Sequence, residues 1–313
     1  MAEGPPTPEE TLAWEAARRR TAGLAGAGAA LLTLAGSLTS GLSRASVPDY
    51  GARTQTVLDT LGRAASGRPQ VPGRFAAQTQ YLGDHAALPI LGAVLFFAGS
   101  MLMFPLMGYL FRATRARRPG FGQIALLLLA FGVAAFAVGR LVVDLGQSIN
   151  AMGFDGGTNS DARDALNSPL VNVGLVLYTV GTLALGFAFV LISLNAMRVG
   201  LLTRFMGILG VIVGATFVLP LDQQGIIRVF WLGALSAIVL GRWPSGVPAA
   251  WTAGEAVPWP SQQEVRERRE AARAAEDDAE ERAARIPPPA PRPEPATAQP
   301  HASSKKRKRK RRA

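Results

Sequence analysis

Residues 122–144 read GQIALLLLAFGVAAFAVGRLVVD, and this stretch decides the fold because its only charged side chains, Arg140 and Asp144, lie at its end. A helix of about 20 apolar residues crosses the roughly 30 Å hydrocarbon core of a bilayer and satisfies its backbone hydrogen bonds internally. A core helix of a soluble protein does not need so long an apolar run. The stretch therefore predicts a transmembrane helix.

Further apolar runs lie on both sides of it, separated by segments with charged, proline or glycine residues. They cover residues 22–43, 86–111, 169–194, 202–221 and 225–242. The last run is the weakest, because its uninterrupted part is short and Arg228 is expected to extend from its outer end to water. We predict an all-α, polytopic transmembrane helix bundle of six spans; a sixth segment that re-enters the membrane is the alternative.

The runs predict how the chain is organised around the membrane. Arginines precede the first run, as in a secretory signal, but the run exceeds a signal core of roughly 7 to 15 residues, so we expect an uncleaved anchor. The predicted parts are a cytoplasmic segment 1–20, a first transmembrane helix 21–43, an extracytoplasmic loop or cap 44–84, transmembrane helices in 85–242, an interfacial segment 243–260, and a charged helix, proline-rich spacer and basic tail in 261–313.

The distribution of arginine predicts the orientation of the helices. The short connections 112–121 and 195–204 are rich in arginine, whereas the opposite connections carry aspartates. Arginine and lysine in short loops favour the cytoplasmic side. The long connection 44–84 also holds arginines and opposes this assignment, but the tail and the two short loops outweigh it. We expect a plasma-membrane protein with both termini in the cytoplasm.

Composition excludes several kinds of chemistry. The chain has no cysteine and two histidines, so thiol nucleophiles, thiolate metal sites and cysteine-ligated iron–sulfur clusters are absent. It also lacks a Gly-Lys dipeptide, a G-x-S-x-G turn and an H-E-x-x-H pair. Oxygen ligands gather at residues 155–161, but without the order of an EF-hand loop. We predict no catalytic activity, no cofactor and no metal.

The C-terminal tail is predicted to be a solvated helix over 261–285, then a disordered proline-rich spacer and a basic cluster. The cluster is Lys305, Lys306, Arg307, Lys308, Arg309, Lys310, Arg311 and Arg312. Each basic residue near an anionic leaflet contributes about 1 kcal/mol of binding, so lipid headgroups are the first interpretation. Nucleic acid, for which the tail lacks stacking aromatics, and an acidic cytoplasmic protein are the alternatives.

Four polar side chains lie inside the predicted bundle. Arg140 and Asp144 are four residues apart and are expected to pair on one helix face, as an interfacial anchor. Tyr178 and Thr182 lie near the middle of the span 169–194, where hydroxyls commonly join neighbouring helices. The functional alternative for all four is a polar site on the path of a solute.

Three tryptophans follow the last span. Trp243, Trp251 and Trp259 lie in a proline-containing stretch, and amphipathic indoles are typical of the headgroup region. We expect interfacial anchors, with an aromatic surface for a partner as the alternative.

The segments GLLTRFMGILG at 200–210, GRWPSG at 241–246 and PWP at 258–260 resemble an uncharacterised domain-of-unknown-function family of six-span bacterial membrane proteins. The resemblance covers mainly residues 85–260. It implies six spans and a bacterial inner membrane, and it implies no activity.

Two functional hypotheses follow from the sequence. The first is a non-catalytic membrane platform whose basic tail binds lipid or a partner. The second is a small-solute transporter whose path passes Arg140, Asp144, Tyr178 and Thr182. An intramembrane enzyme is a weaker third.

Overall fold

A computed structural model describes residues 6–48, 57–68, 73–219, 221–222, 225–244, 246–260 and 262–285. All the regular structure in these ranges is helical, as predicted. The chain divides into two compact units, residues 1–259 and 260–313. The first unit holds the membrane helices and the second holds the tail.

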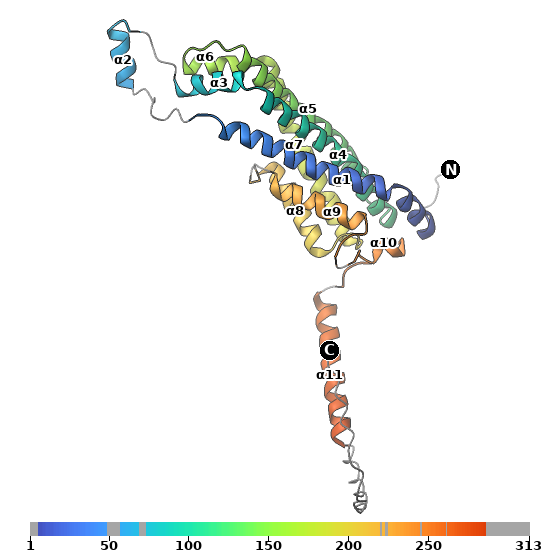
Figure 1. Cartoon of the computed structure of the whole chain (residues 1–313). Helices are drawn as coiled ribbons and strands as arrows, with labels where there is room; N and C mark the ends of the chain where they lie inside the picture. The colour runs from blue at the N-terminus through green and yellow to red at the C-terminus, as the bar shows by residue number, and fades with distance from the viewer. Residues whose placement is uncertain are drawn as a thin grey trace, which may run out of the picture. The chain divides into compact units, whose positions relative to one another are not determined.

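Four long helices form the body of the first unit (Figure 1). They are α1 (Pro8–Ala45), α4 (Ala87–Arg117), α5 (Ile124–Met152) and α7 (Pro169–Arg198). Within the described residues these 4 helices are long and apolar enough to cross a bilayer. They confirm the prediction of a membrane protein.

The last two predicted spans are shorter than expected. They form α8 (Arg204–Val218) and α9 (Ile226–Val239), apolar helices of 15 and 14 residues. At about 1.5 Å of rise per residue each is about 21 to 23 Å long, which is less than the roughly 30 Å hydrocarbon core. The structure therefore supports four spans by length, and the count of six stays a prediction.

Small residues allow the helices to approach closely. A Cβ atom at Gly36 would meet the α4 backbone, and one at Gly132 would meet the α7 backbone. A Cβ at Gly214 in α8 would lie 2.8 Å from the carbonyl oxygen of Gly186 in α7. Such contacts are typical of transmembrane helices, where close backbone packing replaces the hydrophobic effect as the main attraction.

Short helices cover one end of the bundle. They include α3 (Arg74–Asp84) and α6 (Asn159–Leu166), which lie side by side (Figure 1). The Asn159 side chain accepts a hydrogen bond from the Ala76 amide at 3.0 Å, and Ala76 packs with Phe154 and Ala162. We call α3 and α6 the cap. A further helix, α2 (Val57–Ala65), lies in the same connection.

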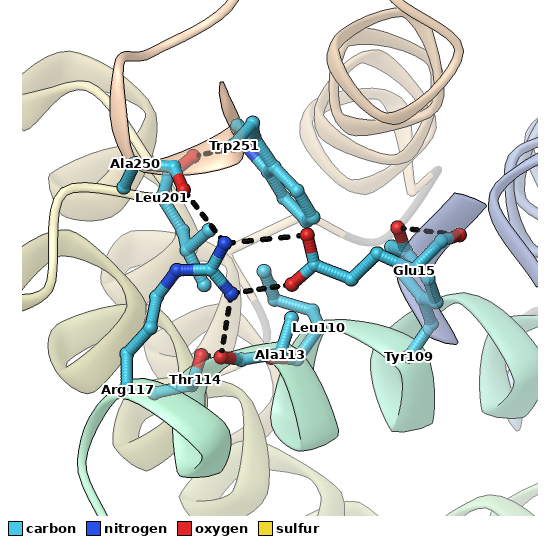
Figure 2. Close-up of polar contacts among 9 residues, drawn as sticks. All are labelled: Glu15, Tyr109, Leu110, Ala113, Thr114, Arg117, Leu201, Ala250 and Trp251. Atoms are coloured by element: carbon cyan, nitrogen blue, oxygen red, sulfur yellow. Dashed lines mark hydrogen bonds and ion pairs between the residues drawn. The ribbon is translucent and has the colours of Figure 1, made fainter. Parts of the chain in front are cut away.

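A buried ion pair joins α1 to α4 near the opposite end. Arg117 donates to both carboxylate oxygens of Glu15 and to the carbonyls of Ala113 and Ala250, and the two charged side chains are 0% and 4% exposed (Figure 2). Ala250 belongs to α10 (Ala250–Ala253), so the pair ties three segments together. Charges this deep are costly unless they are paired and hydrogen-bonded.

Trp251 corrects the expectation of three lipid-facing indoles. It is buried, its Nε1 donates to the Leu201 carbonyl at 2.8 Å, and its ring stacks on Tyr109 at 5.7 Å (Figure 2). Trp259 is 39% exposed and donates to the Leu202 carbonyl at 2.8 Å. Trp251 thus fastens the segment after α9 to the bundle, because its indole N–H has a protein partner.

In the second unit, α11 (Gln262–Arg285) is a helix, and those of its side chains that the structure describes are exposed. This agrees with the predicted solvated helix. The spacer and the basic cluster 305–312 lie outside the described residues.

Candidate functional site

A polar cavity of about 310 Å³ lies between the helices of the first unit. It collects residues from α1, α4, α5, α7, α8 and α9, together with the connection before α9. All four polar residues singled out in the bundle line it: Arg140, Asp144, Tyr178 and Thr182. Arg140 and Tyr178, for example, are 38 positions apart in the sequence, and the packing of α5 on α7 brings them together.

The predicted ion pair within α5 is confirmed. Arg140 Nε donates to Asp144 Oδ2 at 2.7 Å, across one helical turn. The Arg140 guanidinium carbon also lies 5.7 Å from the ring centroid of Phe96 and 5.8 Å from that of Tyr178. The pair forms part of the cavity wall. The spacing of the two residues on α5 predicts that they pair, but it does not predict that they line a cavity.

Tyr178 and Thr182 occupy adjacent turns of α7. Thr182 Oγ1 donates to the Tyr178 carbonyl at 2.7 Å, so its oxygen keeps lone pairs that can accept a hydrogen bond from a ligand. The Tyr178 ring lies 5.2 Å from that of Phe136. Both hydroxyl-bearing residues line the cavity, together with Ser37 and Ser40 of α1.

Arg228 of α9 is the residue that the sequence argument misplaced. We expected it to extend to water, but it is 7% exposed and lines the cavity. Its guanidinium carbon lies 4.3 Å from the ring centroid of Phe217 and 5.5 Å from that of Phe136. Among the described residues, its Nε and Nη1 atoms have no hydrogen-bond partner.

Asp222, the carboxylate nearest in sequence to Arg228, is engaged elsewhere. Its Oδ1 accepts from the Ile226 amide at 2.9 Å and its Oδ2 from the Arg228 amide at 3.3 Å. These bonds satisfy the first amides of α9, which starts after Gly225 in a left-handed conformation with φ of 71°. Within the described residues no ion pair joins the Asp222 carboxylate to the Arg228 side chain.

The charges of the cavity do not cancel. Arg44, Arg140 and Arg228 supply three formal positive charges, and Asp144 and Asp222 supply two negative ones, an excess of one positive charge. The most buried of these arginines has N–H donors that lack a partner among the described residues, so the cavity is chemically suited to an anion.

A second cavity, of about 210 Å³, lies next to the first. The two share Ser40, Arg44, Arg140 and Asp144, and the second is otherwise lined in part by the cap, including Phe75 and Thr79. The Arg140–Asp144 pair therefore stands between the polar cavity and a chamber beneath the cap.

The oxygen-rich segment 155–161 serves the local fold. The Thr158 amide donates to Asp161 Oδ2 at 2.8 Å, and the Asp161 amide donates to the Thr158 hydroxyl at 3.2 Å. Hydrogen bonding from Thr158 to the carboxylate, first from its backbone amide and then from its side chain, holds the pKa of the Asp161 carboxyl below its ordinary value. No group of three or more potential metal ligands occurs among the described residues.

No family model, curated protein or solved structure matches the chain. The resemblance to a six-span family stays an expectation.

Proposed function

We propose that this protein binds a small organic anion in the polar cavity and carries it across the membrane. One observation supports the proposal above the others: the buried Arg228 guanidinium faces the cavity with two nitrogen atoms that lack hydrogen-bond partners among the described residues. Leaving a charge buried and unpaired costs several kcal/mol, on the order of what a bound anion would restore. The geometry thus favours the transporter hypothesis.

The proposed ligand has an anionic group of at least two oxygen atoms, such as a carboxylate or phosphate. Arginine presents N–H donors in a planar fork that matches such groups. Phe96, Phe136 and Phe217 line the same cavity and would contact an apolar or aromatic part of the ligand. A volume of about 310 Å³ is at the small end of ligand pockets, which range over roughly 300–1,000 Å³.

The ligand would enter from the cap side. The chamber beneath α3 and α6 adjoins the cavity, and the Arg140–Asp144 pair lies at their boundary. The oxygen atoms of an arriving anion would replace Asp144 as the partner of Arg140. Passage through the membrane would then require the bundle to open at its other end.

Binding is tested with the purified full-length protein and a panel of carboxylates, phosphates and sulfonates, measured by calorimetry. The R228M variant keeps an unbranched side chain but removes the donors, and we expect it to weaken binding at least 30-fold. R198M removes a charge from the exposed end of α7 and serves as the control. Unchanged binding by R228M, or no binding by the unmodified protein across the panel, would contradict the proposal. Uptake into liposomes then separates transport from binding alone.

The proposed setting is a bacterial inner membrane, crossed six times, with both termini in the cytoplasm. Arginine-rich short loops support this orientation. Because the chain has no cysteine, single cysteines at Ser160 and Ser303 can be labelled without background. We expect a membrane-impermeant maleimide to label S160C in intact cells and S303C only after lysis. The reverse pattern would invert the topology, and labelling of both in intact cells would mean an even number of crossings between residues 160 and 303 in place of the three expected.

The basic tail is a separate proposal. Binding of anionic lipid, of a cytoplasmic protein or of nucleic acid by residues 305–312 rests on charge alone. Affinity capture with full-length protein and with a version ending at Pro260 tests it, and partners lost with the tail would support recruitment. Identical captured sets would contradict it.

A further inference from the structure

A groove of about 370 Å³ lies between α1, α4 and α5, and its walls include Trp14, Arg18, Phe104, Gly108, Arg112 and Leu126. We call it the α1–α4 groove. We propose that it holds one anionic phospholipid, with the phosphate at the two arginines and an acyl chain along Gly108 and Phe104. This binding site is distinct from the polar cavity and from the basic tail.

The two arginines come together because α1 and α4 run antiparallel. A Cβ at Gly26 would meet Leu106, whereas one at Gly99 would meet Thr33, so residue numbers rise on one helix as they fall on the other. By this register Arg18 and Arg112 lie at nearly the same level, one on each helix. Both are exposed, and neither belongs to an ion pair among the described residues.

The groove changes from charged to apolar along its length. Phe104 precedes Arg112 by eight residues, which is about 12 Å along the helix axis. Phe104 is 38% exposed, and a Cβ at Gly108 would meet no other atom within 4 Å. Leu126 adds an apolar wall from α5. An open, apolar channel that begins at two cations matches a phospholipid, whose phosphate and chain are joined in the same order.

Aromatic rings shape the charged end. Trp14 stacks on Tyr109 with ring centroids 5.4 Å apart. The Arg18 guanidinium carbon lies over the Trp14 ring, 5.3 Å from the ring centroid. Tryptophan and tyrosine are favoured at headgroup depth, where one part of the ring system is wet. The contact with Trp14 holds Arg18 beside the groove, so that its charge faces the same place as that of Arg112.

The position of the α1–α4 groove fits a lipid better than a soluble anion. The groove is formed by three of the candidate membrane-spanning helices and leads to an exposed phenylalanine. Arg44, which lines the polar cavity, lies 26 residues after Arg18. This separation is about 39 Å along α1. The two sites can therefore be tested separately.

The test uses native mass spectrometry of the full-length protein in detergent, titrated with phosphatidylglycerol or with phosphatidylcholine of the same acyl chains. We expect one phosphatidylglycerol to bind, and R18Q/R112Q to weaken that binding at least tenfold. The control R20Q/R115Q removes the same charge from α1 and α4 outside the groove and should change binding less than twofold. G108L keeps every charge, places a side chain in the open channel and should also prevent binding.

The proposal would be overturned if R18Q/R112Q bound phosphatidylglycerol as well as the unmodified protein, or if R20Q/R115Q lost as much binding as R18Q/R112Q. It would also be overturned if the protein bound phosphatidylcholine equally well. Full displacement of the lipid by millimolar glycerol phosphate would indicate a soluble anion and would likewise contradict it. Each variant is first checked for a single peak on size exclusion. If R18Q/R112Q does not fold, G108L decides the matter, because retention of the lipid by G108L would contradict the proposed place of the acyl chain.

Discussion

The guanidinium carbon of Arg228 lies 4.3 Å from the ring centroid of Phe217, so the most buried charge of the cavity rests on an aromatic face, and no carboxylate of the described residues forms an ion pair with it. A desolvated cation–π contact contributes about 2 kcal/mol, less than the cost of burying an unpaired guanidinium. We therefore expect a bound anion to stabilise the site, because it would supply the acceptors that the Arg228 Nε and Nη1 atoms lack among the described residues.

Replacing Arg228 by methionine should stabilise the protein without ligand, by about 1–3 kcal/mol, because an unbranched apolar side chain would replace a buried guanidinium whose Nε and Nη1 atoms lack partners among the described residues. The apparent Tm in detergent, followed by tryptophan fluorescence, measures this. R228K keeps a charge and should not raise the Tm. A clear fall in Tm for R228M would mean that the guanidinium is already satisfied, and would count against an anion site.

Replacing Asp144 by asparagine should strengthen anion binding. The change removes a negative charge from the cavity and frees Arg140, which we expect to raise the affinity three- to tenfold, or about 1 kcal/mol. The pair is partly exposed, with side chains 32% and 22% exposed, so its loss should cost stability less than about 1 kcal/mol.

D164N is the matched control for D144N, because it removes the same charge from the exposed helix α6. Calorimetry with the ligand identified above compares the two. Weaker binding by D144N would assign Asp144 to ligand contact, and an equal gain in D164N would reduce the effect to overall charge.

Replacing Glu15 by glutamine should destabilise the bundle by about 3–5 kcal/mol, since the Arg117 charge would stay buried without its counterion. The double variant E15M/R117M removes both charges and should recover much of the loss. Tm values of the three proteins form the test. If E15Q costs as little as an exposed substitution such as E9Q, the ion pair does not hold α1 to α4.

Helix α6 should lose stability in acid because of Asp161. Hydrogen bonds from Thr158 hold the Asp161 pKa below the ordinary value of about 4. Since the folded pKa is the lower one, the carboxylate stabilises the helix fully above the unfolded pKa, and the contribution is lost as pH falls through the folded pKa. As pH rises from about 2 to about 5, hydrogen exchange in residues 159–166 should therefore gain protection in the unmodified protein but not in D161N. Parallel profiles would contradict the capping role.

Sequence reasoning succeeded where the interaction is local. Arg140 and Asp144 pair because they lie one turn apart on one helix, and spacing alone predicts that. It also identified Tyr178 and Thr182 as polar residues at depth, but left open whether they serve packing or a cavity. The same reasoning misplaced Arg228, because a charge near the end of an apolar run usually reaches water and its burial depends on neighbours from α5 and α8.

By itself, the sequence determined the helical class and the membrane as solvent, because apolar runs of about 20 residues leave no other way to satisfy the backbone. Tertiary structure alone decided which polar groups meet. Glu15 and Arg117 are 102 positions apart, and the cavity joins residues from six helices. The periodicity of each helix shows which face is apolar, but the partner of a face depends on close contacts between small residues of different helices, and those contacts arise only when the bundle packs.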